Sequence, residues 1–97
     1  MGNIYKNQSK LRIVLKTGDL TGVQTARIQY TKPNGATGFF PGTLDAANEQ
    51  IYYDVQNTDE LDIAGTWKFW ANLTFNDGRV AYGDPDSYQI FEQGEKL

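Results

Sequence analysis

The residues with the clearest chemical capacity are carboxylates, which gather in two stretches, residues 54–62 and 84–86. Two carboxylates can serve as the acid and the base of glycoside hydrolysis, and several converging carboxylate oxygens can hold Ca²⁺. The spacing here does not match an EF-hand loop, so a calcium ion would have to lie between loops at one end of a β-domain. Aspartate also stabilises turns through its short side chain, and we interpret most of these residues in that way.

The composition removes most other catalytic chemistry. The chain contains no cysteine and no histidine. It therefore has no disulfide, no Cys or His metal ligand, and no thiol or imidazole for catalysis. A β-domain of 97 residues also has little room for a catalytic cleft. We predict a protein that is not an enzyme, with no catalytic residues, no metal and no cofactor.

The pattern around Trp70 favours a binding surface over a reaction site. In residues 66–75, aromatic and aliphatic residues alternate with mostly polar ones, and successive side chains of a strand point to opposite faces. If Trp67 points into the core, Lys68 and Trp70 point outward, with Tyr52 on a nearby outer face. We predict that Trp70, Tyr52 and Lys68 form a face for a partner or a ligand, because exposed aromatic rings bind sugar rings and proteins. The alternative is that Trp70 packs beneath a loop or against the N-terminal segment.

The charge distribution argues against two classes of partner. The net charge is −3, and the nine Lys and Arg residues are scattered instead of forming a block. This pattern disfavours a nucleic acid or an anionic membrane as the partner. The N-terminus shows no apolar run of the kind found in a signal peptide or a membrane span.

Turn signals divide the chain into short strands. Pro33-Asn34-Gly35 and Asn76-Asp77-Gly78 carry the residues that tight turns between antiparallel strands require. Pro41-Gly42 is expected to end the strand that follows the first turn, which leaves residues 43–49 as a loose connection. Strands with period-two alternation are expected at residues 10–17, 26–32, 37–40, 50–55, 66–75, 79–82 and 87–91, with a short edge strand at Ile4 and Tyr5.

The stretch at residues 59–75 is expected to organise the core. Its second half is the most aromatic strand of the chain, with Trp67 facing inward. Its first half lacks alternation. We interpret that half as a crossover that places Leu61 or Ile63 in the core.

These elements predict an all-β fold. About seven short strands, with turn signals at a spacing of about 8–12 residues, are typical of an antiparallel immunoglobulin-like β-sandwich. An open barrel is the alternative. We expect one domain, residues 1–97, with its core at about residues 4–92 and a polar tail or linker at residues 93–97.

Four short motifs follow one another in a recognisable order. A first strand is followed by DLTGV at residues 19–23, and a later strand ends in KPNG at residues 32–35. LDIAGTW at residues 61–67 then leads into a strand and the NDG turn at residues 76–78. Over about residues 4–92, this order resembles the immunoglobulin-like domains of phage virion proteins, in particular the N-terminal immunoglobulin-like domain of upper baseplate proteins.

The resemblance implies a structural role. A domain of that kind would mediate assembly of a phage or prophage virion, in the tail, baseplate, neck or capsid decoration, through protein–protein contacts. Its partners would be virion proteins, with self-association in a ring as one form of closed assembly. It would be made in the bacterial cytoplasm and located in the virion. The alternative is a carbohydrate-binding or adhesion module of a phage or bacterial surface protein, located at the extracellular surface with a surface glycan as its ligand.

Overall fold

The computed structural model of the chain describes residues 4–7, 9, 11–57 and 59–92. In these residues the protein is all-β, as the alternation predicts, with one short 3-10 turn, η1 (Ala46–Asn48). The strands, in chain order, are β1 (Ile4–Tyr5), β2 (Arg12–Lys16), β3 (Val23–Thr31), β4 (Thr37–Asp45), β5 (Gln50–Asp54), β6 (Gly65–Phe75), β7 (Val80–Tyr82) and β8 (Asp86–Phe91).

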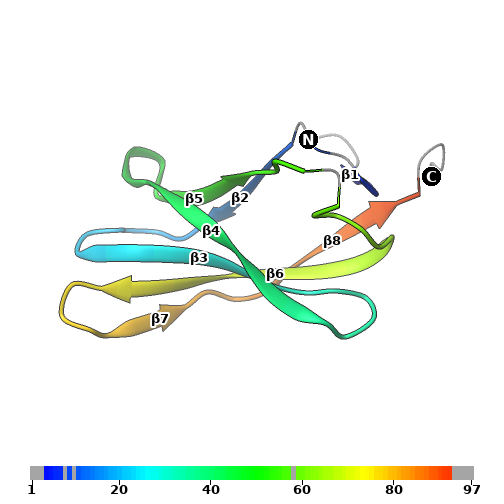
Figure 1. The fold of residues 1–97 in the computed structure, drawn as a ribbon. Helices are drawn as coiled ribbons and strands as arrows, with labels where there is room; N and C mark the ends of the chain where they lie inside the picture. The colour runs from blue at the N-terminus through cyan, green and yellow to red at the C-terminus, as the bar shows by residue number, and fades with distance from the viewer. Residues whose placement is uncertain (1–3, 8, 10, 58, 93–97) are drawn as a thin grey trace.

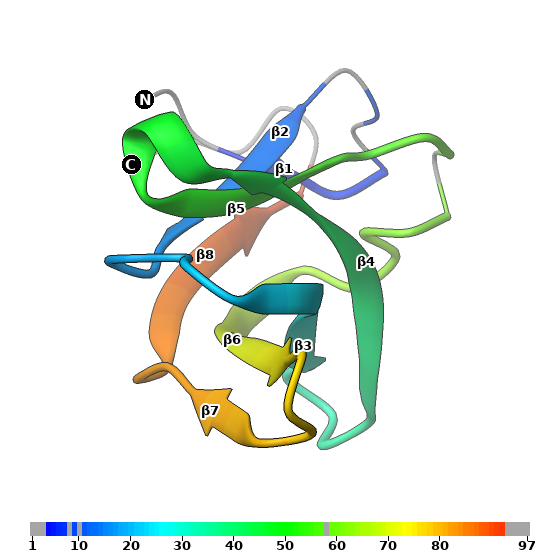
Figure 2. The same cartoon turned by 90° about the vertical axis from the view of Figure 1, so that its left-hand side faces the viewer.

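The strands form one eight-stranded sheet that curls around the core as a half-barrel. The order along the sheet is β1-β8-β6-β3-β4-β5-β2, and β7 pairs with β6 beside β8. Figure 1 shows the long strands β3 and β6 crossing the molecule, with β2 and β5 above them. Figure 2 looks along these strands and shows β4 joining the two parts of the curl. The first part of β4 pairs with β3, and residues 43–45 pair with β5.

Strand β4 corrects one sequence prediction. We expected Pro41-Gly42 to end the strand and residues 43–49 to be loose, but β4 continues to Asp45 and pairs with β5. The N–H of Lys32 donates to Ala36 O (2.8 Å), and alternate residues of an antiparallel strand bond to the same neighbour. Position 41 therefore directs its backbone nitrogen away from β3. The pairing with β5 begins only at Thr43, so proline removes no donor that the sheet uses.

The direction of β1 is a second correction. The seven expected strands and the expected edge strand at Ile4 and Tyr5 all form in the described residues, but β1 runs parallel to β8, whereas we expected an antiparallel fold. The predicted strand at residues 10–17 is β2, although Lys10 lies outside the described residues. Strand β3 begins at Val23, three residues earlier than expected. The tail predicted at residues 93–97 also lies outside the described residues.

Both predicted tight turns are confirmed. After β3, Gly35 has φ +88° and its N–H donates to Lys32 O (2.9 Å). After β6, Gly78 has φ +88° and its N–H donates to Phe75 O (3.0 Å). A positive φ is readily adopted by glycine alone among common residues, which is why these positions define the registers of β4 and β7.

The alternation of β6 is confirmed and it supplies the centre of the core. Trp67 and Phe69 are fully buried, and Ala71 and Leu73 are also buried. The remaining core residues come from the other strands and connections: Ile4, Ile13, Leu15, Leu20, Ala26, Ile28, Phe40, Ile51, Val55, Leu61 and Ile90. The core therefore fills the interior of the curl between its two ends.

The crossover between β5 and β6 is held by buried and hydrogen-bonded side chains. Leu61 is fully buried, as predicted, and Ile63 packs against the core. The indole N–H of Trp67 donates to Ile63 O (2.8 Å). The hydroxyl of Tyr53 donates to the carboxylate of Glu60 (2.7 Å to Oε2). The non-repetitive segment is thus attached to both strands that it connects.

Replacing Trp67 is expected to destabilise the fold severely. Trp67→Ala removes a fully buried ring and should lower the free energy of unfolding by about 3–5 kcal/mol. Trp67→Phe keeps most of the ring but loses the donor to Ile63 O, and should cost less than Trp67→Ala. Urea denaturation followed by circular dichroism measures both. Equal stability of wild type and Trp67→Ala would contradict this account of the core.

The stability of the crossover is expected to decrease at alkaline pH through Tyr53. Burial, followed by the hydrogen bond and charge of Glu60, raises the pKa of Tyr53 to about 12 from 10.0. The folded state therefore keeps the phenolic proton to higher pH than the unfolded chain does. The resulting stabilisation is fully present below about pH 10 and is lost as the pH rises through about 12.

Denaturation midpoints between these pH values check this expectation. The midpoint should fall more steeply for wild type than for Tyr53→Phe, which has no phenolic proton to lose. Tyr82→Phe serves as the control because Tyr82 is 69% exposed, and it should follow wild type. The same slope in Tyr53→Phe and wild type would show that Tyr53 does not carry the effect.

Candidate functional site

The surface opposite the core collects the exposed aromatic side chains of the sheet. Residues paired across neighbouring strands point to the same side. The surface is therefore defined by the outward residues of β6, their partners on β3, β7 and β8, and the β4 residues that pair with β3. We call it the outer face. Its members are Thr25, Arg27, Gln29, Thr31, Thr37, Phe39, Pro41, Thr66, Lys68, Trp70, Asn72, Thr74, Val80, Tyr82, Ser87 and Gln89.

Three aromatic rings lie along the outer face. Gln29 is in register with Phe39 on one side and with Trp70 on the other, so Phe39 and Trp70 are about 10 Å apart across β3. Tyr82 is in register with Asn72, two residues from Trp70, which is a diagonal separation of about 7–8 Å. Phe39 is 48% exposed and Tyr82 is 69% exposed, while Trp70 is half-buried. The rings form a track across four strands.

The charged residues of the outer face are all cationic. The guanidinium of Arg27 lies 4.4 Å from the centre of the Phe39 ring, and Lys68 is exposed two residues before Trp70. Within the described residues, no ion pair joins either cation to a carboxylate. No member of the outer face is an aspartate or a glutamate, although the chain has 12 of them. The face is therefore positive in a protein whose net charge is −3.

The structure unites two of the three residues predicted from the sequence. Trp70 and Lys68 share the outer face on β6. Tyr52 lies on β5, three strands from β6 in the sheet order, where its ring stacks under the guanidinium of Arg12 (3.9 Å). Tyr52 is in register with Thr43, so it points to the same side of the sheet as Phe39, but β3 and β4 lie between β5 and β6 and the sheet curls there (Figure 2). A face shared by Tyr52 and Trp70 therefore stays a prediction.

Sequence reasoning missed Phe39, Tyr82 and Arg27. Phe39 and Phe40 are adjacent in a strand, so one of the two rings had to point outward. For Tyr82, the turn at Asn76-Asp77-Gly78 fixes which residues of β7 face outward. These signals were present in the sequence, but the pairing of β3 with β6 was needed to place Phe39 in line with Trp70.

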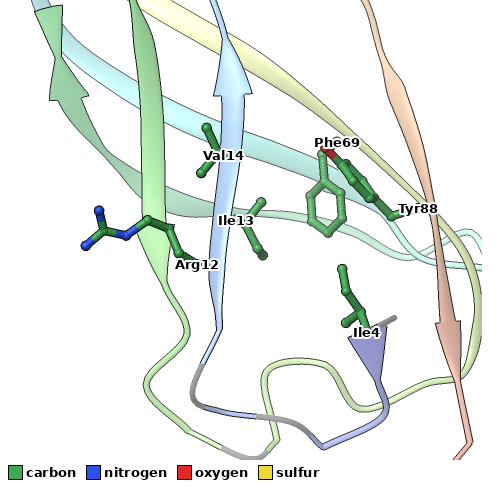
Figure 3. Close-up of a pocket in the computed structure, with 6 residues that line it drawn as sticks. All are labelled: Ile4, Arg12, Ile13, Val14, Phe69 and Tyr88. Atoms are coloured by element: carbon green, nitrogen blue, oxygen red, sulfur yellow. The ribbon is translucent and has the colours of Figure 1, made fainter. Parts of the chain in front are cut away.

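A second surface feature lies where the two ends of the curled sheet approach each other. Figure 3 shows a crevice between β2 on one side and β1, β6 and β8 on the other, lined by Ile4, Arg12, Ile13, Val14, Phe69 and Tyr88. Burial, and then the charge of Asp86, raise the pKa of Tyr88, so its phenol stays neutral over the ordinary pH range. The crevice is apolar and small.

The acidic stretch at residues 54–62 acts mainly within the fold. Asp54 pairs with Arg12 (2.7 Å) and Asp62 pairs with Lys32 (2.9 Å). The side-chain hydrogen bond from Arg12 lowers the pKa of Asp54. In the part of the chain that the structure describes, no group of three or more His, Cys, Asp or Glu residues is placed to hold a metal ion.

The likeness of this chain to known proteins concerns its fold. No protein-family model and no curated protein matches the sequence. Among solved structures, the crystal structure of CopC from Methylosinus trichosporium OB3b is similar, with a TM-score of 0.60 over 100% of this chain and 91% of that chain. The two sequences are 13% identical, so the comparison concerns the fold alone.

Among the described residues, no helix has the length and apolar character to cross a membrane.

The exposed rings of the outer face are expected to contribute little to stability. Phe39→Thr and Tyr82→Thr keep a residue that suits a strand and should change the free energy of unfolding by no more than about 0.5 kcal/mol. Urea denaturation measures the effect, with Trp67→Ala as the destabilised reference. A loss of about 2 kcal/mol or more in either variant would mean that these rings support the fold and are not free for binding.

Proposed function

We propose that this chain is a non-enzymatic structural module of a phage or prophage virion, built as an immunoglobulin-like β-sandwich. The two parts of the curled sheet would be the layers of the sandwich. Ile51 of β5 and Trp67 of β6 are both fully buried between them, which supports this arrangement. The sequence motifs that resemble phage immunoglobulin-like domains support the virion assignment. The expected location is the virion, after synthesis in the bacterial cytoplasm.

The observation that carries an assembly role is the unpaired edge of β2. Within the described residues, β2 pairs only with β5. The N–H of Val55 donates to Leu11 O (2.8 Å), so alternate residues from Leu11 onward bond to β5 and the N–H of Val14 faces the free edge. Such an edge can accept a strand from another subunit. Val14 also borders the apolar crevice of Figure 3, which could receive a side chain of that strand.

The neighbouring subunit in this proposal is a second copy of the chain. Arg12 and Lys16 flank Val14 and are both exposed on the same strand. Charged side chains at an edge suppress unspecific pairing between strands. Only a strand whose register avoids repulsion by Arg12 and Lys16 would then pair with β2. Repetition of such a contact between identical subunits closes a ring when the rotation between them permits it.

Sedimentation over a range of protein concentrations tests this role. Wild type should associate into a defined oligomer, and Val14→Pro should remain monomeric because proline removes the N–H that faces the edge. Val14→Ala keeps that N–H and should associate as wild type does. Circular dichroism confirms that each variant is folded.

Two outcomes would overturn assembly through β2. Wild type could remain monomeric at every concentration, or Val14→Pro could associate as strongly as Val14→Ala. The second outcome would place any self-association on another surface.

A specific observation also favours a second candidate function, carbohydrate binding at an extracellular surface. The rings of Phe39, Trp70 and Tyr82 are separated by the amides of Gln29 and Asn72. Aromatic rings stack on sugar rings, and amides both donate to and accept from hydroxyl groups. Titration of oligosaccharides while recording tryptophan fluorescence, with Trp70→Ala as the comparison, tests this candidate.

A further inference from the structure

The outer face differs in charge from the rest of the molecule. Arg27 and Lys68 give it two positive charges and it has no carboxylate, whereas the whole chain carries a net charge of −3. The acidic residues that the structure describes therefore lie elsewhere. This separation favours an anionic ligand at the outer face, because opposite charges attract the ligand to the correct surface and like charges repel it from the others.

The carboxylates of the chain itself are largely engaged and do not reach this face. Asp54 and Asp62 are paired with cations, Glu60 accepts hydrogen bonds from Tyr53, and Asp77 pairs with Arg79. Arg27 and Lys68 have no such partner within the described residues. Among the described residues, both cations are therefore available to an anionic group of another molecule.

The arrangement of the rings indicates the class of that molecule. Protein-binding patches are usually contiguous and apolar at their centre, whereas here polar side chains separate each ring from the next. A row of isolated rings framed by amides and hydroxyls suits a chain of sugar units, with apolar sugar faces on the rings and sugar hydroxyls on the amides. The track runs across β4, β3, β6 and β7, so the ligand would lie across the strands.

The two cations lie on either side of this track. Arg27 on β3 is in register with Asn72, four residues from Lys68 along β6. The two positions are therefore about 14 Å apart, counting the step between the strands. A guanidinium can bind a carboxylate through two parallel hydrogen bonds. Two cations on opposite sides of the track can each meet a carboxylate of the same sugar chain. Nucleic acids are usually bound through many phosphate contacts, more than these two cations supply.

We propose that the outer face binds an acidic polysaccharide. The sugar rings stack on Phe39, Trp70 and Tyr82, and sugar carboxylates pair with Arg27 and Lys68. This inference rests on the second candidate function, carbohydrate binding, and adds the charge class of the ligand. It does not depend on assembly through β2.

Titration of the full chain with polygalacturonate and with hyaluronan tests the proposal. Fully methyl-esterified polygalacturonate is the neutral comparison. The chain has two tryptophans and Trp67 is fully buried, so a change in fluorescence on binding reports on Trp70. We expect binding of at least one acidic polymer that weakens with added salt, weak or absent binding of the ester, and loss of the fluorescence change in Trp70→Ala.

A pair of double variants separates a specific site from general charge attraction. Arg27→Gln with Lys68→Gln should weaken acidic-polymer binding by about tenfold or more. The control, Lys16→Gln with Arg79→Gln, changes the net charge equally at residues outside the outer face and should bind as wild type does. Unchanged circular dichroism spectra establish that both double variants are folded.

Each remaining outcome overturns part or all of the proposal. Equal binding of the neutral ester would refute the charge class while leaving carbohydrate binding in place. No binding of either acidic polymer or of the ester would refute both. If the control double variant lost as much affinity for the acidic polymers, their binding would reflect general charge attraction and not a specific site. Tighter binding of oligodeoxythymidine than of either acidic polymer would indicate that the outer face binds nucleic acid.

Discussion

The burial of Trp67 is the interaction on which the rest of the structure depends. Its ring is fully buried between the two parts of the curled sheet, 5.4 Å from the ring of Tyr30 and 5.9 Å from that of Phe69. Its indole N–H also satisfies a carbonyl of the crossover, at Ile63. One side chain therefore packs the core and fixes the path of the non-repetitive segment. The half-buried pair of Lys32 and Asp62 lies beside it, with the ammonium 5.5 Å from the Trp67 ring.

The same strand produces both the core and the candidate site. Because side chains alternate along a strand, the burial of Trp67, Phe69 and Ala71 forces Lys68 and Trp70 outward. The hydrogen-bonded registers of β3 and β7 then place Arg27 and Tyr82 beside them. A change in the packing of β6 would thus alter the outer face, even though no residue of that face lies in the core. Assembly through β2 would use a different edge, so the two proposed roles are structurally independent.

Much of the fold could be predicted because the relevant signals are local. The glycines at positions 35 and 78 occupy turns that need a positive φ, and the alternation of β6 identifies its buried side without any knowledge of the partners. Pro41 was misread because the effect of a proline depends on which neighbour its nitrogen faces, and that depends on the pairing of β4 with β3 and then β5. The parallel pairing of β1 with β8 is equally non-local.

The sequence by itself determined that the protein is all-β, that Trp67 is central to its core, and that Cys and His chemistry is absent. It also placed Trp70 and Lys68 on one outward side, since period two is a property of every strand. Only the tertiary structure decided which rings share that side. Tyr52 lies on β5, with β3 and β4 between it and Trp70. Phe39 and Tyr82 lie near Trp70 because β3 and β6, which are distant in sequence, pair with each other and bring their hairpin partners β4 and β7 to the same surface. A surface made by several strands depends on their order and register, which no single segment specifies.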